Sequence, residues 1–79
     1  MDNEIKLKNI LAVTFGANVS DIDDESSPDN LEKWDSLKHL NLIISLEEEF
    51  SVSFSEEEVV EMMSLALIRE VLIEHGITF

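Results

Sequence analysis

The apolar residues between positions 37 and 50 recur at intervals of three and four, and this spacing constrains the fold more than any other feature of the chain. Such intervals place side chains on one face of an α-helix, whereas a strand would need strict alternation. Asp35 stands at the N-cap position, so the helix is predicted to run from about Ser36 to Phe50. A helical wheel predicts a core arc of Leu40, Ile43, Leu46 and Phe50, with Leu37 and Ile44 at its edge.

Apolar stripes also predict a helix at each end of the chain. The first runs from about Asn3 to Phe15 and stops at Gly16, because glycine tolerates the left-handed conformation that ends many helices. The last runs from Leu65 to His75 and stops at Gly76 for the same reason.

A short helix and a long connection complete the chain. Ser55 and Glu58 have the spacing of a capping box, which predicts a helix ending at about Glu61 or Met62. Residues 17–34 are rich in Asn, Asp and Ser, with a turn of helix expected over residues 20–24. The apolar residues expected to pin this loop to the core are Val19, Ile22 and Leu31.

These elements predict an all-α fold. The expected architecture is a small four-helix bundle of three longer helices and one short helix. A long loop separates the first two helices, and one domain covers residues 1–79.

The chain is strongly acidic, with 18 Asp and Glu against 5 Lys and Arg among 79 residues, a net charge of −13. This charge repels nucleic acid and anionic membranes and favours basic patches on protein partners. No apolar run approaches the roughly 20 residues that span a bilayer, and the start of the chain lacks a signal-peptide pattern. We therefore expect a cytoplasmic monomer that binds no nucleic acid and does not insert stably into membranes.

Self-contained catalysis is not expected. Ser36 and His39 are three residues apart, but one small helix offers neither an oxyanion hole nor a pocket. His39 is expected at the edge of the core and His75 at a helix C-terminus, where positive charge is favoured.

No dedicated metal site is expected either. The chain contains no cysteine, which excludes thiolate ligands. Four acidic residues match a calcium-loop spacing, namely Asp21, Asp23, Glu25 and Glu32. The turn residues do not fit, because Ser26 replaces the required glycine and Pro28 follows it.

Ser36 is the candidate site for an anionic group. Backbone N–H groups at a helix start are unpaired and the helix dipole is positive there, so a phosphate ester would be favoured. Asp-Ser is also a common start for any helix. Leu37, Asn41, Ile44 and Glu48 form a half-exposed stripe that suits an apolar and basic partner, or else belongs to an ordinary amphipathic helix.

Three segments occur in a familiar order and spacing. They are Asp35-Ser36-Leu37, then Leu46-Glu47-Glu48-Glu49-Phe50, then Phe54-Ser55-Glu56-Glu57-Glu58 before the last helix. With the first helix and the long loop, this pattern resembles the acyl carrier proteins over nearly the whole chain.

The resemblance implies that Ser36 accepts 4′-phosphopantetheine from coenzyme A in a magnesium-dependent reaction of a separate phosphopantetheinyl transferase. The terminal thiol of that arm would hold an acyl group as a thioester. The protein would then be a carrier in fatty-acid, lipid or polyketide-type biosynthesis, not an enzyme. Its partners would be acyl-transferring and acyl-processing enzymes with basic patches. The matching docking positions are Asp35, Leu37, Ile44, Glu47, Glu48 and, less closely, Glu56.

The sequence departs from the family pattern in three places. Lys33-Trp34 stands where many relatives have glycine and a small or apolar residue, Lys38 replaces a common acid, and Asn41 replaces another. These departures suggest a carrier dedicated to a specialised pathway, and aminoacyl or peptidyl cargo stays open. The alternative from another class is a non-covalent acidic adaptor whose Ser36 carries no arm.

Overall fold

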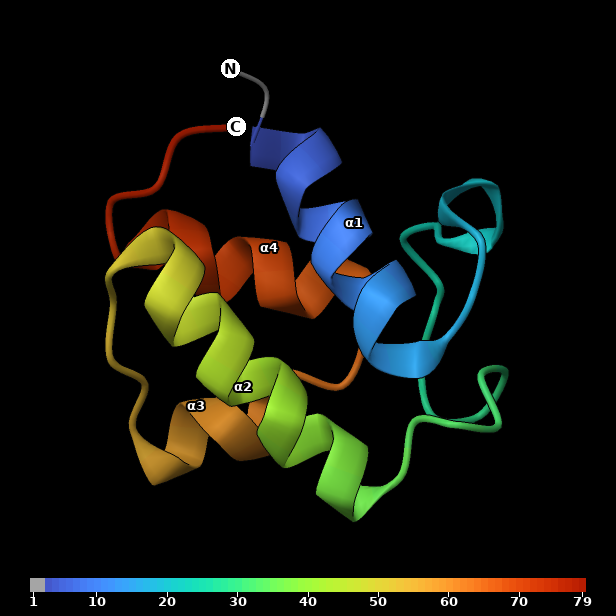
Figure 1. Ribbon diagram of the computed structural model, residues 1–79. Coiled ribbons are helices and arrows are strands. Elements are labelled where there is room, and N and C mark those ends of the chain that lie inside the picture. The colour runs from blue at the N-terminus through green and yellow to red at the C-terminus, as the bar shows by residue number, and fades with distance from the viewer. Residues whose placement is uncertain (1–2) are drawn as a thin grey trace.

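The computed structural model describes residues 3–79, and within them the chain forms four α-helices, one 3-10 helix and no strand (Figure 1). In chain order the elements are α1 (Asn3–Phe15), η1 (Val19–Asp21), α2 (Ser36–Phe50), α3 (Glu56–Glu61) and α4 (Leu65–Glu74). The predicted all-α fold class is confirmed for these residues. The predicted bounds hold for α1 and α2, and α3 ends at Glu61 as predicted, whereas α4 ends one residue early because His75 is its C-cap. The turn of helix expected over residues 20–24 was wrong in its bounds, because it is η1 at Val19–Asp21. Part of the signal-peptide argument falls on Met1 and Asp2, which lie outside the described residues.

Local hydrogen bonds explain where α2 and α3 begin. The Lys38 N–H donates to Asp35 Oδ1 at 2.9 Å, so Asp35 is the N-cap of α2, as predicted. At α3, Ser55 and Glu58 form the predicted capping box, in which each side chain accepts a hydrogen bond from the backbone N–H of the other. The cap at Asp35 makes Ser36 the first residue of α2.

Two glycines end the outer helices. Gly16 has a φ of 64° and Gly76 a φ of 93°, a region that side chains other than glycine rarely adopt. Beyond Gly76 the Ile77 N–H donates to the Leu72 carbonyl at 3.0 Å, and the residue after Gly16 makes the equivalent bond in α1.

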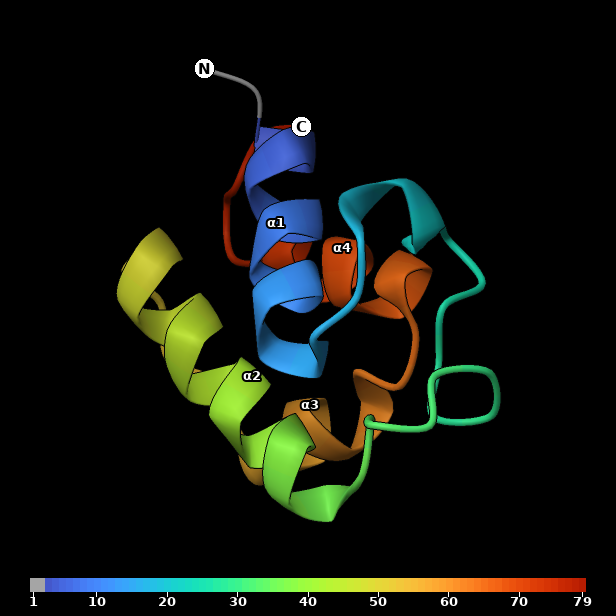
Figure 2. The ribbon, with the colours of Figure 1, turned by 45° about the vertical axis from the view of Figure 1, so that its right-hand side comes forward.

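The helices enclose one apolar core. α1 packs against α2 and α3 against α4, and Figures 1 and 2 show α4 passing behind α1. The ends of the described chain meet, because Asn3 Nδ2 donates to the Thr78 carbonyl at 2.8 Å. The core residues are Leu7, Leu11, Ala12, Phe15, Ile22, Trp34, Leu42, Ile43, Leu46, Phe50, Met62, Leu65, Ile68, Val71 and Leu72.

The predicted core arc of α2 was wrong at one position. Leu40 is 54% exposed, whereas Leu42 is completely buried and takes its place. His39 is also buried, so the inner face of α2 includes His39 and Leu42 and leaves Leu40 at the surface. Ile43, Leu46 and Phe50 are buried as predicted.

The long loop is only partly anchored as expected. Ile22 is buried and Leu31 packs against the core, but Val19 is exposed, so the prediction for Val19 was wrong. Loop carbonyls also contact the last helix, because the Leu65 N–H donates to the Ser26 carbonyl at 3.1 Å. The loop therefore supplies an acceptor to the unpaired first turn of α4.

Candidate functional site

Ser36 is exposed at the N-terminal end of α2. Asp35 accepts the N–H of Lys38, while the N–H groups of Ser36 and Leu37 have no partner within the helix. Leu37 is 68% exposed directly beside the serine. The hydroxyl is therefore accessible and lies where the helix dipole favours negative charge.

A depression of about 470 Å³ opens beside Ser36. We call it the Ser36 depression; its lining residues are Pro28, Trp34, Asp35, Ser36, His39, Leu40 and Met63. Leu40 and Met63 expose apolar side chains there, so the depression is largely apolar although it borders a helix start.

A larger groove of about 570 Å³ lies between α1 and α2, away from Ser36. It contains Ile5, Val13 and Glu48, while Lys6 and Glu49 at its edge form an ion pair at 3.5 Å. Size alone would favour this groove. The Ser36 depression is the better candidate for covalent chemistry, because it is lined by an exposed serine hydroxyl at the start of a helix.

The floor of the Ser36 depression is a chain of hydrogen bonds. Trp34 Nε1 donates to His39 Nδ1 at 3.0 Å. An indole N–H can only donate, so the ring proton of His39 sits on Nε2, which donates to the Val59 carbonyl of α3 at 2.7 Å. Trp34 also stacks on Phe15, with ring centroids 4.7 Å apart. This Trp34 hydrogen-bond chain joins the loop, α2 and α3, and two of its members, Trp34 and His39, line the same depression as Ser36.

Some of the predicted docking residues are exposed, whereas others make hydrogen bonds within the protein. Leu37 and Ile44 are 68% and 55% exposed, and Glu48 is exposed on the same face of α2. Glu47 instead accepts the Phe54 N–H at 2.9 Å and so fastens the connection between α2 and α3. Asp35 caps α2, and Glu56 is exposed on α3. Leu40, missed as a surface residue, extends this exposed face.

Two lysines flank Ser36 in the sequence, and neither forms a salt bridge within residues 3–79. Lys33 Nζ lies beside Gly16 at the C-terminal end of α1, where the dipole favours a cation. Lys38 lies in the first turn of α2, where the dipole disfavours one. Lys38 is thus a free cation close to Ser36.

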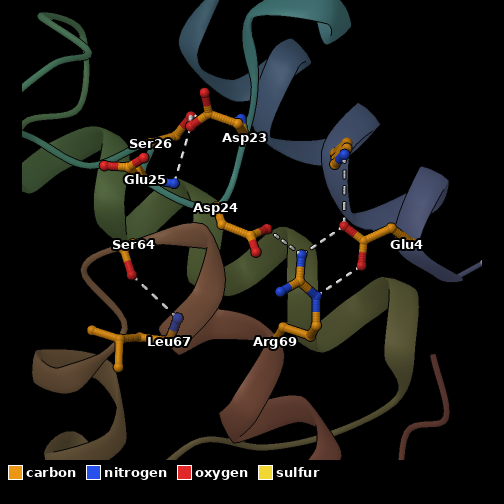
Figure 3. A network of polar contacts seen from close by, with 9 residues as sticks. Glu4, Asp23, Asp24, Glu25, Ser26, Ser64, Leu67 and Arg69 are labelled. Atoms are coloured by element: carbon orange, nitrogen blue, oxygen red, sulfur yellow. Dashed lines mark hydrogen bonds and ion pairs between the residues drawn. The ribbon is translucent and has the colours of Figure 1, made fainter.

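A second polar network joins α1, the loop and α4 (Figure 3). Arg69 of α4 donates to both carboxylate oxygens of Glu4 at 2.7 Å and to Asp24 Oδ1 at 2.6 Å. We call these three residues the Arg69 cluster. The hydrogen bond from Arg69 lowers the pKa of Asp24, and the two carboxylates raise the pKa of Arg69.

His75 lies near a helix end as expected, and its Nε2 is 2.9 Å from Glu58 Oε2. The pKa of Glu58 is lowered first by the Ser55 N–H and then by His75. Between residues 3 and 79 no three His, Asp or Glu side chains gather in a way that could hold a metal ion. Over the same range no helix has the length and apolar content to cross a bilayer.

No model of a known protein family matches this chain, and no curated protein sequence matches it.

Proposed function

We propose that this protein is a carrier whose Ser36 is esterified by 4′-phosphopantetheine. The single observation that carries the proposal is the exposed Ser36 at the capped start of α2, beside an apolar depression. The proposal includes a carrier-type packing of the four helices, a monomeric state and a cytoplasmic location.

The attachment step makes one bond and breaks one. Ser36 Oγ bonds to the coenzyme A phosphorus nearest pantetheine, and adenosine 3′,5′-bisphosphate leaves with the bridging oxygen. The Ser36 proton passes to the transferase, which supplies the catalytic groups and the magnesium ion. The product phosphodiester is an anion at a helix N-terminus, where the N–H groups and dipole stabilise it.

The exposed face of α2 supports docking to the transferase and to acyl-processing enzymes. Leu37, Leu40 and Ile44 offer apolar contact on one face, and Glu48 lies free at its far end for a basic group. An apolar centre with a charged rim is typical of protein interfaces. The cation at Lys38 favours a dedicated pathway over general fatty-acid synthesis, and aminoacyl cargo is equally compatible with the arm.

Two matched variants test this docking face. Leu37→Ala should lower the kcat/KM of loading about tenfold, equal to about 1.4 kcal/mol of lost contact, with little loss of stability. Leu42→Ala removes a fully buried side chain and should cost about 2–5 kcal/mol of stability. Urea unfolding and loading kinetics measure both. A large stability loss in Leu37→Ala would place that side chain in the core and refute the docking role.

The attachment itself is tested by intact mass after incubation with coenzyme A, magnesium and a broad-specificity phosphopantetheinyl transferase. The parent chain should gain one phosphopantetheinyl mass and Ser36→Ala none. Ser20→Ala, which removes another exposed serine, is the control and should load like the parent. Partner binding that survives Ser36→Ala, with no mass gain in the parent, would favour the non-covalent adaptor instead.

A further inference from the structure

The route from Ser36 into the interior is closed. An arm at Ser36 would begin at the Ser36 depression, because Ser36 itself lines that depression. Its floor consists of Trp34, 3% exposed, and His39, 8% exposed. Trp34 is itself part of the apolar core, and the His39–Val59 hydrogen bond joins α2 to α3.

Separating α2 from α3 would break hydrogen bonds between polar groups that are surrounded by apolar side chains. Trp34 Nε1 has His39 as its partner, and His39 uses both ring nitrogens, on Trp34 and on Val59. No buried side-chain nitrogen or oxygen among the described residues lacks a partner. Parting α2 from α3 would leave these groups unpaired, and an acyl chain has no hydrogen-bonding groups to replace them.

We infer that the cargo of this carrier is a short acyl or aminoacyl group that stays in the Ser36 depression, because entry of a long chain into the core from that depression would break the Trp34 hydrogen-bond chain. The inference rests on the proposed function and adds the class of cargo. The exposed side chains of Leu40 and Met63 can contact a short group in the depression.

The experiment is a chain-length series on the loaded protein. The transferase attaches the arm from acetyl-, hexanoyl- and decanoyl-coenzyme A, and mass spectrometry confirms each product before thermal unfolding. The three forms should melt within about 1 °C of one another with unchanged Trp34 emission. A chain taken into the core would raise the melting temperature by about 3–6 °C per buried methylene. A progressive rise of that kind would overturn the inference.

A variant tests whether the Trp34 hydrogen-bond chain is the barrier. In His39→Ala the melting temperature should rise with chain length, whereas in Leu40→Ala, on the rim of the same depression, it should not. Circular dichroism checks that both variants fold. If His39→Ala is unfolded, the chain-length series on the parent protein alone still tests whether the cargo is short. A folded His39→Ala with no chain-length effect would overturn the barrier role. No loading of any analogue would refute the proposed function itself.

Discussion

Two polar networks join distant parts of this chain in different ways. The Trp34 hydrogen-bond chain links the loop, α2 and α3 through uncharged groups, of which the Trp34 and His39 side chains are buried and Val59 is partly buried. The Arg69 cluster links α1, the loop and α4 through charges, and the Asp24 side chain in it is 61% exposed. Both networks close the fold, but only the first lies at Ser36.

The two networks differ in solvent exposure, and this difference determines how much each contributes to the stability of the fold. Removing the partner of a buried polar group lowers the free energy of unfolding substantially, because water cannot reach the group and replace the lost hydrogen bond. Exposed ion pairs contribute little, since water and salt screen them. We therefore expect the hydrogen bonds beside Ser36 to contribute more to stability than the Arg69 cluster, and we expect only the contribution of the Arg69 cluster to depend on salt and pH.

The largest effect should come from Trp34→Ala. This change removes a ring stacked between Phe15 and His39 and should lower the free energy of unfolding by about 3–5 kcal/mol. Trp34→Phe keeps an aromatic ring but removes the indole N–H, and should cost about 1–3 kcal/mol. Urea unfolding followed by circular dichroism measures both. Equal stability of Trp34→Phe and the parent would show that the hydrogen-bond chain does not hold the site.

A smaller effect should come from Arg69→Met, which keeps a long side chain but removes the charge. We expect a loss of about 1–2 kcal/mol at low salt, because the bidentate Arg69–Glu4 pair is part-buried whereas the Asp24 carboxylate is exposed. The difference from the parent should shrink in 1 M salt, where the Debye length is about 3 Å. If Arg69→Met lowered the free energy of unfolding as much as Trp34→Ala does, and independently of salt, the two networks would not differ in the way we propose.

The smallest effect should come from Asp24→Asn, and it should depend on pH. Arg69 lowers the pKa of Asp24 in the folded chain, so the contribution of this carboxylate is present above its unfolded pKa of about 3.9. It is lost as the pH falls through the lower folded value. Melting curves of parent and variant should therefore differ slightly at pH 6 and converge in acid. A difference that grows in acid would contradict this assignment.

Local signals were enough to predict the helices. Asp35 and Ser55 are caps whose partners lie three residues away, and Gly16 and Gly76 are stops, so no tertiary information was needed. The same holds for Ser36, whose position follows from the cap at Asp35.

The errors concern side chains whose role depends on distant contacts. A wheel based on hydropathy put Leu40 inside and His39 at the edge, because nothing local indicates that Val59, twenty residues on, accepts a hydrogen bond from His39. Glu47 was predicted as a docking residue from the family resemblance, and its hydrogen bond from the Phe54 N–H could not be predicted because it depends on the path of the following turn. Trp34, noticed only as a departure from the family pattern, proved to be the floor of the depression.

The central claim is that Ser36 carries a phosphopantetheine arm in the cell. The most direct measurement is peptide mapping by mass spectrometry of the protein purified from the cells that make it. We predict a phosphopantetheinyl group on the peptide that contains Ser36, absent when the gene encodes Ser36→Ala, together with loss of the protein's cellular activity. An unmodified Ser36 peptide throughout, with activity retained by Ser36→Ala, would contradict the account.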